Sequence, residues 1–432
     1  IVFFIPHTQP FLKGTNSNQK AYLCRKNTYF SAMERIPFSP PRTDQKTVDA
    51  VTEVLLSGWI TTGPKTKLFE KNIEAYLNSK RVICLNSWTN ACELMLRAFD
   101  VGEGDEVILP AYTYAATANI VCHVGATPVL ADVNPRTFHL EPEELLSKIS
   151  QRTKAVMPVD IGGLPVDYNA IEKVIAQANF KANSEMQEAL GRPLFLSDAA
   201  HSFGATYKQE KVGKQADVTG YSFHAVKNLT TAEGGALALN MPEPFLNDEL
   251  YKQLNIKSLH GQTKDALAKT QGGSWRYDII EPGYKCNMTD LQAAIGLVEL
   301  ERYDETLARR KFISESYHKG FSDQNWYLAP VLKDDSRETS YHLFMLSIDN
   351  CTEEKRDLIM AELAEKGIST NVHFQPIPML SYYKGMGYKM SDYPNSFTSY
   401  SREISLPVYF DLTDNQVDRI ISEVIKTVNK LL

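Results

Sequence analysis

The sequence predicts an α/β protein, with a mostly parallel central sheet that carries helices on both faces and a smaller C-terminal α+β domain. Between residues 51 and 238, short apolar stretches alternate with amphipathic helical stretches, which is typical of a parallel sheet covered by helices. After residue 290, a helical pattern over 291–319 leads into a shorter mixture of strands and helices. With 432 residues, 43% hydrophobic and 23% charged, the chain can form two or three folded units.

Strands are expected where apolar residues stand together, and helices where they recur with helical spacing. The expected strands of the large sheet cover 81–85, 106–109, 127–132, 155–159, 194–197 and 235–239, with a further strand-like run at 219–223. The expected helices cover 91–99, 141–149 and 168–178, and the polar segment 176–192 is expected to be a surface insertion. The smaller domain is expected to hold strands 341–348 and 369–373 and helices 353–366 and 414–431.

These patterns divide the chain into three parts. Residues 1–32 are expected to be a disordered extension or to precede the true start at Met33. Residues 33–290 are expected to form the large ligand-binding domain, and residues 291–432 the linking helix and the small domain.

Composition argues against several classes of protein. The 46 basic and 52 acidic residues give a net charge of −6, so nucleic acid and anionic membranes are poor partners. The six cysteines form no C-x-x-C pair, which argues against a zinc cage or a disulfide framework and predicts a reducing cytoplasm. The longest apolar stretches are strand-sized, far below the roughly 20 residues of a membrane helix, so a soluble protein is expected. We predict no metal site.

One lysine stands in an unusual setting. The segment 222–236, SFHAVKNLTTAEGGA, places Lys227 between a strand and a Gly-Gly turn that re-enters a buried strand. Lys227 is therefore expected at the rim of the sheet, partly removed from water. Burial lowers the pKa of an ammonium group, and the neutral amine is the form that adds to a carbonyl carbon. A solvated lysine is nevertheless the commoner outcome for a loop, so neighbouring segments must decide.

Three neighbouring segments favour a chemical role. Asp198 ends a predicted parallel strand, and its carboxylate is expected in the crevice where α/β sheets bind ligands. The segment 86–91, NSWTNA, lies between a strand and a helix, where free N–H groups and the Ser87 and Thr89 hydroxyls can hold a phosphate. Tyr112 and Tyr114 follow another strand and can cover a flat ring. Lysine, acid, phosphate cup and aromatic platform together describe a pyridoxal phosphate site.

Each of these residues also has an ordinary structural explanation. Asp198 can cap a helix, Ser87 and Thr89 can form a normal N-cap, and Tyr114 can pack in the core. His201, three residues after Asp198, can be a hydrogen-bonded histidine. Four such features in the right order along the chain favour the chemical interpretation.

From about residue 36 onward, the sequence resembles the DegT/DnrJ/StrS family of sugar aminotransferases, which are fold-type I pyridoxal phosphate enzymes. The resemblance lies in GWITTGPK (58–65), GDEVILPAYTYAATAN (104–119), VGATPVLADV (124–133), RTKAVMPVDIGGLPVD (152–167), LSDAAHSFGATY (196–207), the lysine segment above, GYKCNMTDLQAAIG (283–296) and GISTNVHFQP (367–376). The wording is closest to the branch that transfers an amino group to UDP-linked 4-amino-4-deoxy-arabinose precursors.

The resemblance implies a role for each matched residue. Lys227 forms the imine with the cofactor and later moves the proton, and Asp198 pairs with the pyridine nitrogen. The remaining cofactor contacts that it implies are His201 at the phenolic oxygen, Tyr114 stacked on the ring, Trp88, Thr89 and Ser222 at the phosphate, and Asn287 reaching the phosphate from a dimer partner, with Lys285 as the alternative. His373, Lys285 and Thr61 are expected at the sugar substrate.

The implied reaction is amino transfer from L-glutamate, which leaves as 2-oxoglutarate, to a nucleotide-linked keto sugar, above all a 4-keto sugar, in a cytoplasmic homodimer. Its products are expected to serve cell-surface polysaccharide or lipopolysaccharide synthesis. Two alternatives stay open: a dehydratase of the same family, in which histidine replaces the imine lysine, and an idle relative that binds cofactor or sugar as a regulator. Trp88 is bulkier than the family's usual small residue, and Asp160 stands where a histidine is usual, which puts substrate contacts there in doubt.

Overall fold

The computed structural model describes residues 34–264 and 276–432. The predictions for residues 1–32 and for the start at Met33 lie outside the described residues. No helix in the described part of the chain is long and apolar enough to cross a membrane. The described residues also hold no cluster of three or more His, Cys, Asp or Glu side chains suited to a metal ion.

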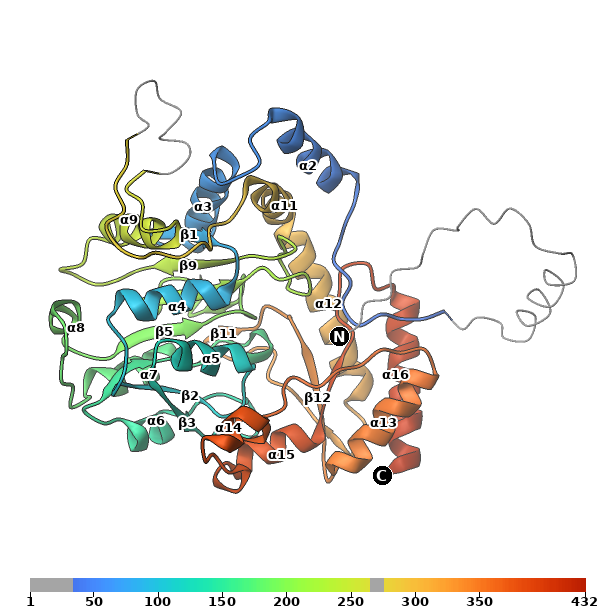
Figure 1. The fold of residues 1–432 in the computed structure, drawn as a ribbon. Helices are drawn as coiled ribbons and strands as arrows, with labels where there is room; N and C mark the ends of the chain where they lie inside the picture. Colours follow the sequence, from blue (N-terminus) through green and yellow to red (C-terminus); the bar gives the residue numbers. More distant parts are fainter. Residues whose placement is uncertain (1–33, 265–275) are drawn as a thin grey trace, which may run out of the picture.

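A seven-stranded sheet forms the centre of the fold and confirms the predicted α/β class (Figure 1). Its order is β1 (Arg81–Leu85), β9 (Gly235–Leu239), β8 (Val218–Ser222), β5 (Leu194–Asp198), β4 (Thr153–Val156), β2 (Glu106–Pro110) and β3 (Thr127–Ala131). The pairs from β8 to β3 are parallel, whereas β9 runs antiparallel to both β8 and β1. Because β1 and β8 both oppose β9, β1 runs in the same direction as the parallel strands.

The antiparallel course of β9 corrects the expectation of one more parallel strand at 235–239. A parallel connection needs a crossover of about a dozen residues or more, usually a helix. Here the loop between β8 and β9 folds back on itself, with the Phe223 N–H donating to the Gly234 carbonyl at 2.9 Å. The chain therefore returns beside β8 in the opposite direction.

Helices cover both faces of the sheet. Helices α4 (Trp88–Ala98), α5 (Ala115–His123) and α9 (Asn247–Ser258) pack on one face, and α3 (Pro64–Leu77), α6 (Pro142–Lys148), α7 (Tyr168–Ala176) and α11 (Asp290–Glu301) pack on the other. Alternate residues of β1 enter the two cores, Ile83 on the first face and Val82 on the second, as the period of a strand requires. Helix α2 (Gln45–Ser57) packs against α11.

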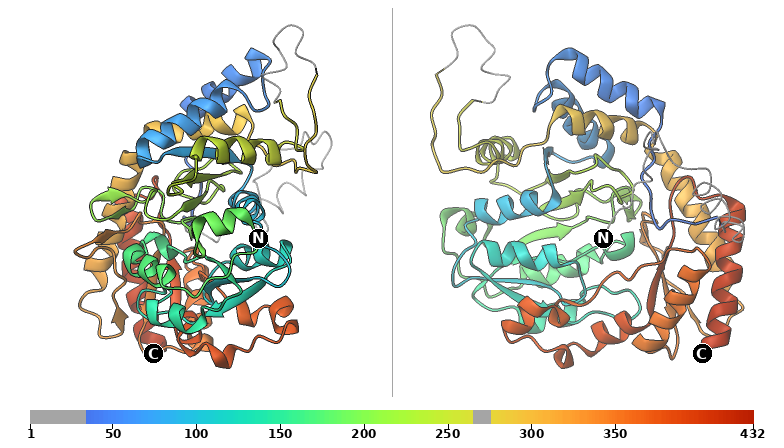
Figure 2. Two further views of the ribbon diagram at one scale, coloured as in Figure 1. Left: turned by 90° about the vertical axis from the view of Figure 1, so that its left-hand side faces the viewer. Right: turned by 45° about the vertical axis from the view of Figure 1, so that its right-hand side comes forward.

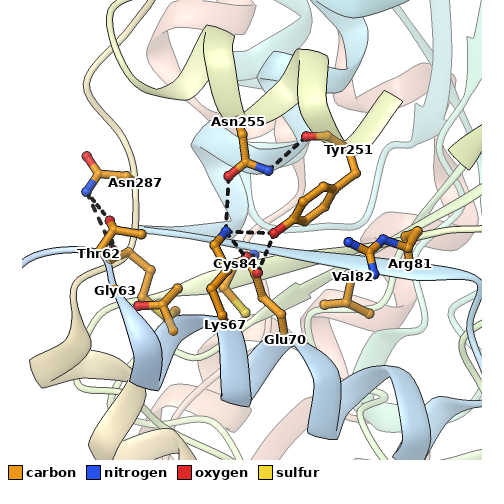
Figure 3. A network of polar contacts seen from close by, with 12 residues as sticks. Thr62, Gly63, Lys67, Glu70, Arg81, Val82, Cys84, Tyr251, Asn255 and Asn287 are labelled. Atoms are coloured by element: carbon orange, nitrogen blue, oxygen red, sulfur yellow. Dashed lines mark hydrogen bonds and ion pairs between the residues drawn. The ribbon is translucent and has the colours of Figure 1, made fainter. Parts of the chain in front are cut away.

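The exposed edge of the sheet at β1 is closed by two carboxylates of α3, of which Figure 3 shows Glu70. Glu70 accepts the Cys84 N–H and Glu74 accepts the Val82 N–H, each at 2.9 Å. Glu70 in turn accepts hydrogen bonds from Tyr251 at 2.7 Å and from Lys67 at 3.1 Å. These contacts satisfy the outward N–H groups of β1, which could otherwise pair with a strand of another chain.

The C-terminal part forms a second core around a three-stranded antiparallel sheet. Its strands are β10 (Tyr327–Leu328), β12 (Phe344–Ile348) and β13 (Glu403–Leu406). Helices α12 (Tyr303–Phe321), α13 (Glu353–Glu365) and α16 (Asp414–Leu431) pack on it, and Figure 2 shows the last two at one end of the molecule. Ile36, from the start of the described chain, also packs in this core. The domain boundary at 290 stays a prediction.

Two expectations for this region are wrong. The single helix over 291–319 is two helices that meet at Arg302, whose guanidinium binds Asp44 and Glu299 and holds the chain at the bend. The strand over 369–373 is reduced to one bridge between Asn371 and Ser405. Elsewhere in the segment, His373 bonds to the side chains of Glu403 and Ser405, whereas the Ser369 N–H donates to the Ile36 carbonyl, so no ladder forms.

Short elements complete the described fold. A small sheet of β11 (Arg337–Glu338), β6 (Thr206–Tyr207) and β7 (Glu210–Lys211) joins the two parts. The remaining helical elements are η1 (Ile161–Gly163), α8 (Glu185–Leu190), η2 (Ile377–Met379), α14 (Ser381–Gly385), η3 (Met390–Asp392) and α15 (Pro394–Arg402). Helix α8 lies in the predicted insertion, where the buried Gln187 donates to the Phe99 carbonyl at 2.9 Å and ties the segment to the core.

Candidate active site

The sheet brings the predicted residues of the large domain to one edge. Strands β1, β2, β4, β5 and β8 all run in one direction, so their carboxyl ends meet there. Ser222 ends β8, Asp198 ends β5, and Trp88 follows β1 at the start of α4. Such an edge is where open α/β sheets bind ligands.

Lys227 lies in the loop between β8 and β9 and is partly exposed. A turn shapes the loop, because the Lys227 N–H donates to the His224 carbonyl at 2.9 Å. Burial of the ammonium group lowers the pKa of Lys227 to about 8, against the opposing effect of Asp198. Among the described residues, no side chain forms a hydrogen bond or a close ion pair with the Lys227 amine, so it is available to a ligand.

Asp198 is a buried acid, 5% exposed, without a cationic partner within 4.0 Å in the described part of the chain. Thr117 donates to one oxygen at 2.8 Å, and the Ala200 N–H donates to the other at 3.2 Å. Burial raises the pKa of Asp198 to about 6, although these donors and the Lys227 charge act in the opposite direction. A buried acid in this state gains from a cationic N–H group.

His201 lies beside Lys227 with its proton position fixed by the backbone. The Gly162 N–H donates to His201 Nδ1 at 3.2 Å, so Nδ1 is the acceptor and the proton of the neutral ring is on Nε2. Burial, with the Lys227 charge, holds the pKa of His201 well below its ordinary value. The His342 ring packs 4.4 Å from that of His201, and its Nδ1 donates to the Asn228 amide oxygen at 2.9 Å.

The start of α4 forms a cup for an anion. Ser87 caps the helix by accepting the Asn90 N–H at 3.1 Å, and the N–H groups of Trp88 and Thr89 have no acceptor within the helix. Gly235 of β9 passes so close that a Cβ atom there would stand 2.2 Å from the Trp88 nitrogen. The Trp88 indole is buried in the core and its Nε1 has no partner among the described residues, so only the backbone of Trp88 faces the cup.

Tyr114 and side chains from the second part of the chain, among them His373 and Phe374, form the remaining side of the candidate site. The Tyr114 ring is 61% exposed and lies 5.4 Å from the ring of Phe374. His373 is flanked by Phe38 and Phe374, and burial with the Lys227 charge lowers the pKa of His373 to about 3. Both His201 and His373 also pack against the Phe374 ring, and the Lys227 charge acts on both, so the three side chains lie near one another.

Thr61, Lys285 and Asn287 belong to a separate group on the outer side of β1. Asn287 donates to Thr62 at 2.6 Å and accepts from Lys285, as Figure 3 shows for the first contact. The Thr61 carbonyl accepts the Asp290 N–H at 3.1 Å. Within the described parts of one chain, no hydrogen bond or ion pair connects this group to Lys227, Asp198 or His201. The role of Asn287 at the site of a dimer partner, with Lys285 as the alternative, and the roles of Lys285 and Thr61 at the sugar stay predictions.

Sequence reasoning missed Thr117, Asn228 and His342. Thr117 lies three residues after Tyr114 in the quoted segment 104–119, and Asn228 directly follows Lys227. Both therefore belong to the segments already singled out, but nothing in their spacing predicts the residues that they contact. His342 comes from a distant part of the chain. Asp160, whose substrate role was in doubt, is fully buried and accepts from the Val166 N–H, Tyr168 and Ser202. Its carboxylate therefore organises the interior.

Pyridoxal phosphate fits the residues at this edge. The unpaired acid Asp198 suits a protonated pyridine nitrogen, the α4 cup suits a phosphate, and the accessible amine of Lys227 suits a carbonyl carbon. The close approach of Gly235 to α4 leaves backbone, and no side chain, beside the cup. The three features are the three ends of this cofactor.

Comparison with known proteins gives a consistent result. The model of the DegT/DnrJ/EryC1/StrS aminotransferase family matches residues 41–425. A curated relative, the spore coat polysaccharide biosynthesis protein SpsC of Bacillus subtilis, is 39% identical over 394 residues, covering 90% of this chain and 96% of its own.

Solved structures are also similar. The putative sugar aminotransferase Spr1654 from Streptococcus pneumoniae, in its PMP form, is 45% identical with a TM-score of 0.89, covering 92% of this chain and 100% of its own. Its PLP form gives 43% identity, the same coverage and a TM-score of 0.88. Helicobacter pylori PseC, an aminotransferase involved in pseudoaminic acid biosynthesis, is 27% identical with a TM-score of 0.80, covering 92% of this chain and 100% of its own.

Proposed function

Because the chain belongs to the DegT/DnrJ/EryC1/StrS aminotransferase family, we propose that it transfers an amino group from L-glutamate to a nucleotide-linked 4-keto sugar. Pyridoxal phosphate is the cofactor of this family. When bound, it supplies a carbonyl carbon that condenses with amines and a ring that withdraws electrons. One observation carries the proposal. The amine of Lys227 and the buried acid Asp198 lie at the same edge of the sheet, and neither has an ion-pair partner in the described part of the chain.

The residues of this chain have distinct tasks in the proposed reaction. Asp198 holds a proton on the pyridine nitrogen, and Thr117 orients the carboxylate for that contact. Lys227 takes a proton from one carbon and returns it to another, and its pKa of about 8 suits both steps near neutral pH. His201 donates its Nε2 proton to the ring oxygen, while the N–H groups of Trp88 and Thr89, with Ser222, bind the phosphate.

The proposed substrate region lies between the two parts of the chain. The Lys227 charge acts on His373, and Phe374 contacts both the His373 ring and the exposed ring of Tyr114. We place Asn287, with Lys285 as the alternative, at the site of the partner subunit in a homodimer, because Asn287 bridges to Leu85 at the edge strand β1 and its hydrogen bonds stay within its own group. Thr61 and Lys285 are proposed contacts of the sugar. The preference for a UDP-linked sugar rests only on the similarity of the sequence motifs to one branch of the family.

The biological setting is also part of the proposal. A relative that is named for spore coat polysaccharide biosynthesis supports a role in cell-surface glycan precursors. Lipopolysaccharide synthesis and a cytoplasmic location remain predictions from the sequence. The dehydratase alternative is disfavoured by Lys227 itself, and the idle alternative by the intact pair of Lys227 and Asp198.

The test is turnover with defined substrates. Protein loaded with pyridoxal phosphate should convert L-glutamate to 2-oxoglutarate and then pass ¹⁵N from labelled glutamate to one member of a panel of UDP-, dTDP- and GDP-linked 4-keto sugars. Lys227→Ala should retain cofactor but lose both half-reactions, whereas the exposed Lys208→Ala should match the wild type. Full activity in Lys227→Ala would refute the assignment, and cofactor binding without any 2-oxoglutarate would favour the idle alternative.

A further inference from the structure

A series of hydrogen bonds connects β13, in the three-stranded sheet of the C-terminal part, to His373. Glu403 and Ser405 lie two residues apart in β13, and therefore on the same face of the strand. Ser405 Oγ lies 2.5 Å from Glu403 Oε1 and 2.8 Å from His373 Nδ1. The second oxygen of Glu403 accepts the His373 backbone N–H at 2.9 Å. The series of bonds thus ends on His373, the histidine on which the Lys227 charge acts.

The hydroxyl of Ser405 has one proton and two hydrogen-bonding neighbours, so it must donate to one and accept from the other. If Glu403 is protonated, Glu403 donates to Ser405 and Ser405 donates to His373 Nδ1, which leaves the ring proton on Nε2. If Glu403 is ionised, both bonds reverse, the ring proton is on Nδ1, and Nε2 becomes an acceptor. The amide nitrogen of Asn371, 3.5 Å from Nε2, can donate to it in this second pattern. In the first pattern both groups are donors, so Asn371 makes no bond to the ring and its amide oxygen keeps the Val372 N–H.

Burial decides between the two patterns at neutral pH. Glu403 is 0% exposed, and in the described part of the chain no cation lies within 4.0 Å of its carboxyl group. The Arg356 charge acts on it from α13, but that guanidinium bonds to the Tyr400 carbonyl and to Asp357, each at 2.6 Å. The other titratable groups nearby, Tyr112, Tyr400 and His373, are neutral. Burial raises the pKa of Glu403 to about 8.

We propose that Glu403, acting through Ser405, is a positioning residue that fixes which ring nitrogen of His373 carries the proton, and so makes Nε2 a hydrogen-bond donor at neutral pH. This inference rests on the proposed function, which places His373 at the substrate. A donor at Nε2 selects an unprotonated substrate oxygen, such as that of a keto group or a phosphate. Ionisation of Glu403 would turn the same atom into an acceptor without moving a heavy atom.

The direct test is the tautomer of His373, measured by ¹⁵N NMR on the full-length protein with labelled histidine. His373→Gln assigns the signals. The wild type should carry the proton on Nε2 at pH 6.5 and on Nδ1 at pH 9.5. Glu403→Gln can donate to Ser405 and accept from the His373 N–H at every pH, so it should keep Nε2 protonated throughout. Glu365→Gln, at an exposed position of α13, should behave as the wild type.

A wild-type tautomer that is the same at both pH values, or a Glu403→Gln protein that switches as the wild type does, would overturn the proposal. A second arm uses the loaded enzyme and a UDP-linked 4-keto sugar. Ser405→Ala should raise the KM for the sugar about tenfold, the effect of losing one oriented hydrogen bond. It should leave the 2-oxoglutarate half-reaction unchanged within about twofold.

The two arms separate the two claims. An unchanged sugar KM in Ser405→Ala would contradict the relay, because the serine would then not influence the substrate. If the wild type uses none of the keto sugars, the proposed function fails, and the NMR result alone decides whether Glu403 sets the tautomer of His373. Cofactor binding by each variant shows that the site is folded.

Discussion

Asp198→Asn should stabilise the cofactor-free protein while abolishing its activity. The pKa of this carboxyl is raised from 3.8 to about 6 by burial, so the folded protein binds its proton more tightly than the unfolded chain does. The destabilisation is therefore absent well below the unfolded pKa of 3.8, grows between that value and the folded pKa of about 6, and is complete above it. A shift of about two pKa units corresponds to about 3 kcal/mol at pH 7.5.

Asparagine removes the ionisation and retains the local contacts. Its oxygen can accept the Ala200 N–H, and its amide can donate to Thr117, so no buried polar atom loses its partner. Urea unfolding of the cofactor-free proteins should show the variant more stable by up to about 3 kcal/mol at pH 7.5 and by about half of that at pH 5. Turnover should fall at least about a hundredfold, because the ring nitrogen loses its acidic partner.

The matched control is Asp217→Asn. Asp217 is equally buried, but the Arg192 guanidinium binds both of its oxygens at 2.7 Å. Removal of one partner from a buried ion pair destabilises, so this variant should lose stability at pH 7.5. The reasoning is refuted if Asp198→Asn is less stable than the wild type at both pH values, or if its stability advantage does not shrink at pH 5.

Two further predictions concern the cup at the start of α4. Gly235→Ala should weaken cofactor binding by at least about tenfold, because the new methyl group would stand 2.2 Å from the Trp88 nitrogen and must displace the helix start. An unchanged affinity for the cofactor in a fluorescence titration would contradict this geometry. Trp88→Phe should keep activity within about threefold and lose only about 1 kcal/mol of stability, because the indole Nε1 is buried without a partner in the described structure. A large loss of cofactor affinity would show instead that the Trp88 side chain contacts the phosphate.

The sequence predicted the class of fold because the large sheet is built from local signals. Apolar runs such as 194–197 and 106–109 coincide with β5 and β2 to within a residue, and the capped helix over 414–431 has the expected bounds. The direction of β9 could not be read in the same way. An apolar strand looks alike in either direction, and only the loop that follows Lys227 decides how it pairs.

The candidate site was predictable to the extent that its residues follow strands. Asp198, Ser222 and the start of α4 come to one edge because parallel strands share an end. Contacts between distant segments left no local trace. Neither the bond from Thr117 to Asp198 nor the bonds from β13 to His373 follow from spacing, since the first depends on how α5 packs on the sheet and the others on how the segment of His373 lies along β13. The segment 369–373 has the residue pattern of a strand, and the pattern does not reveal that it forms only one bridge to β13.

The central claim is that Lys227 is the amine that meets the cofactor while Asp198 holds the far side of its ring. Borohydride reduction of protein loaded with pyridoxal phosphate, followed by digestion and mass spectrometry, tests it most directly. The added mass should appear on the peptide that contains Lys227 and should be absent in Lys227→Ala. Labelling of another lysine in the wild type, with Lys227 unmodified, would contradict the account.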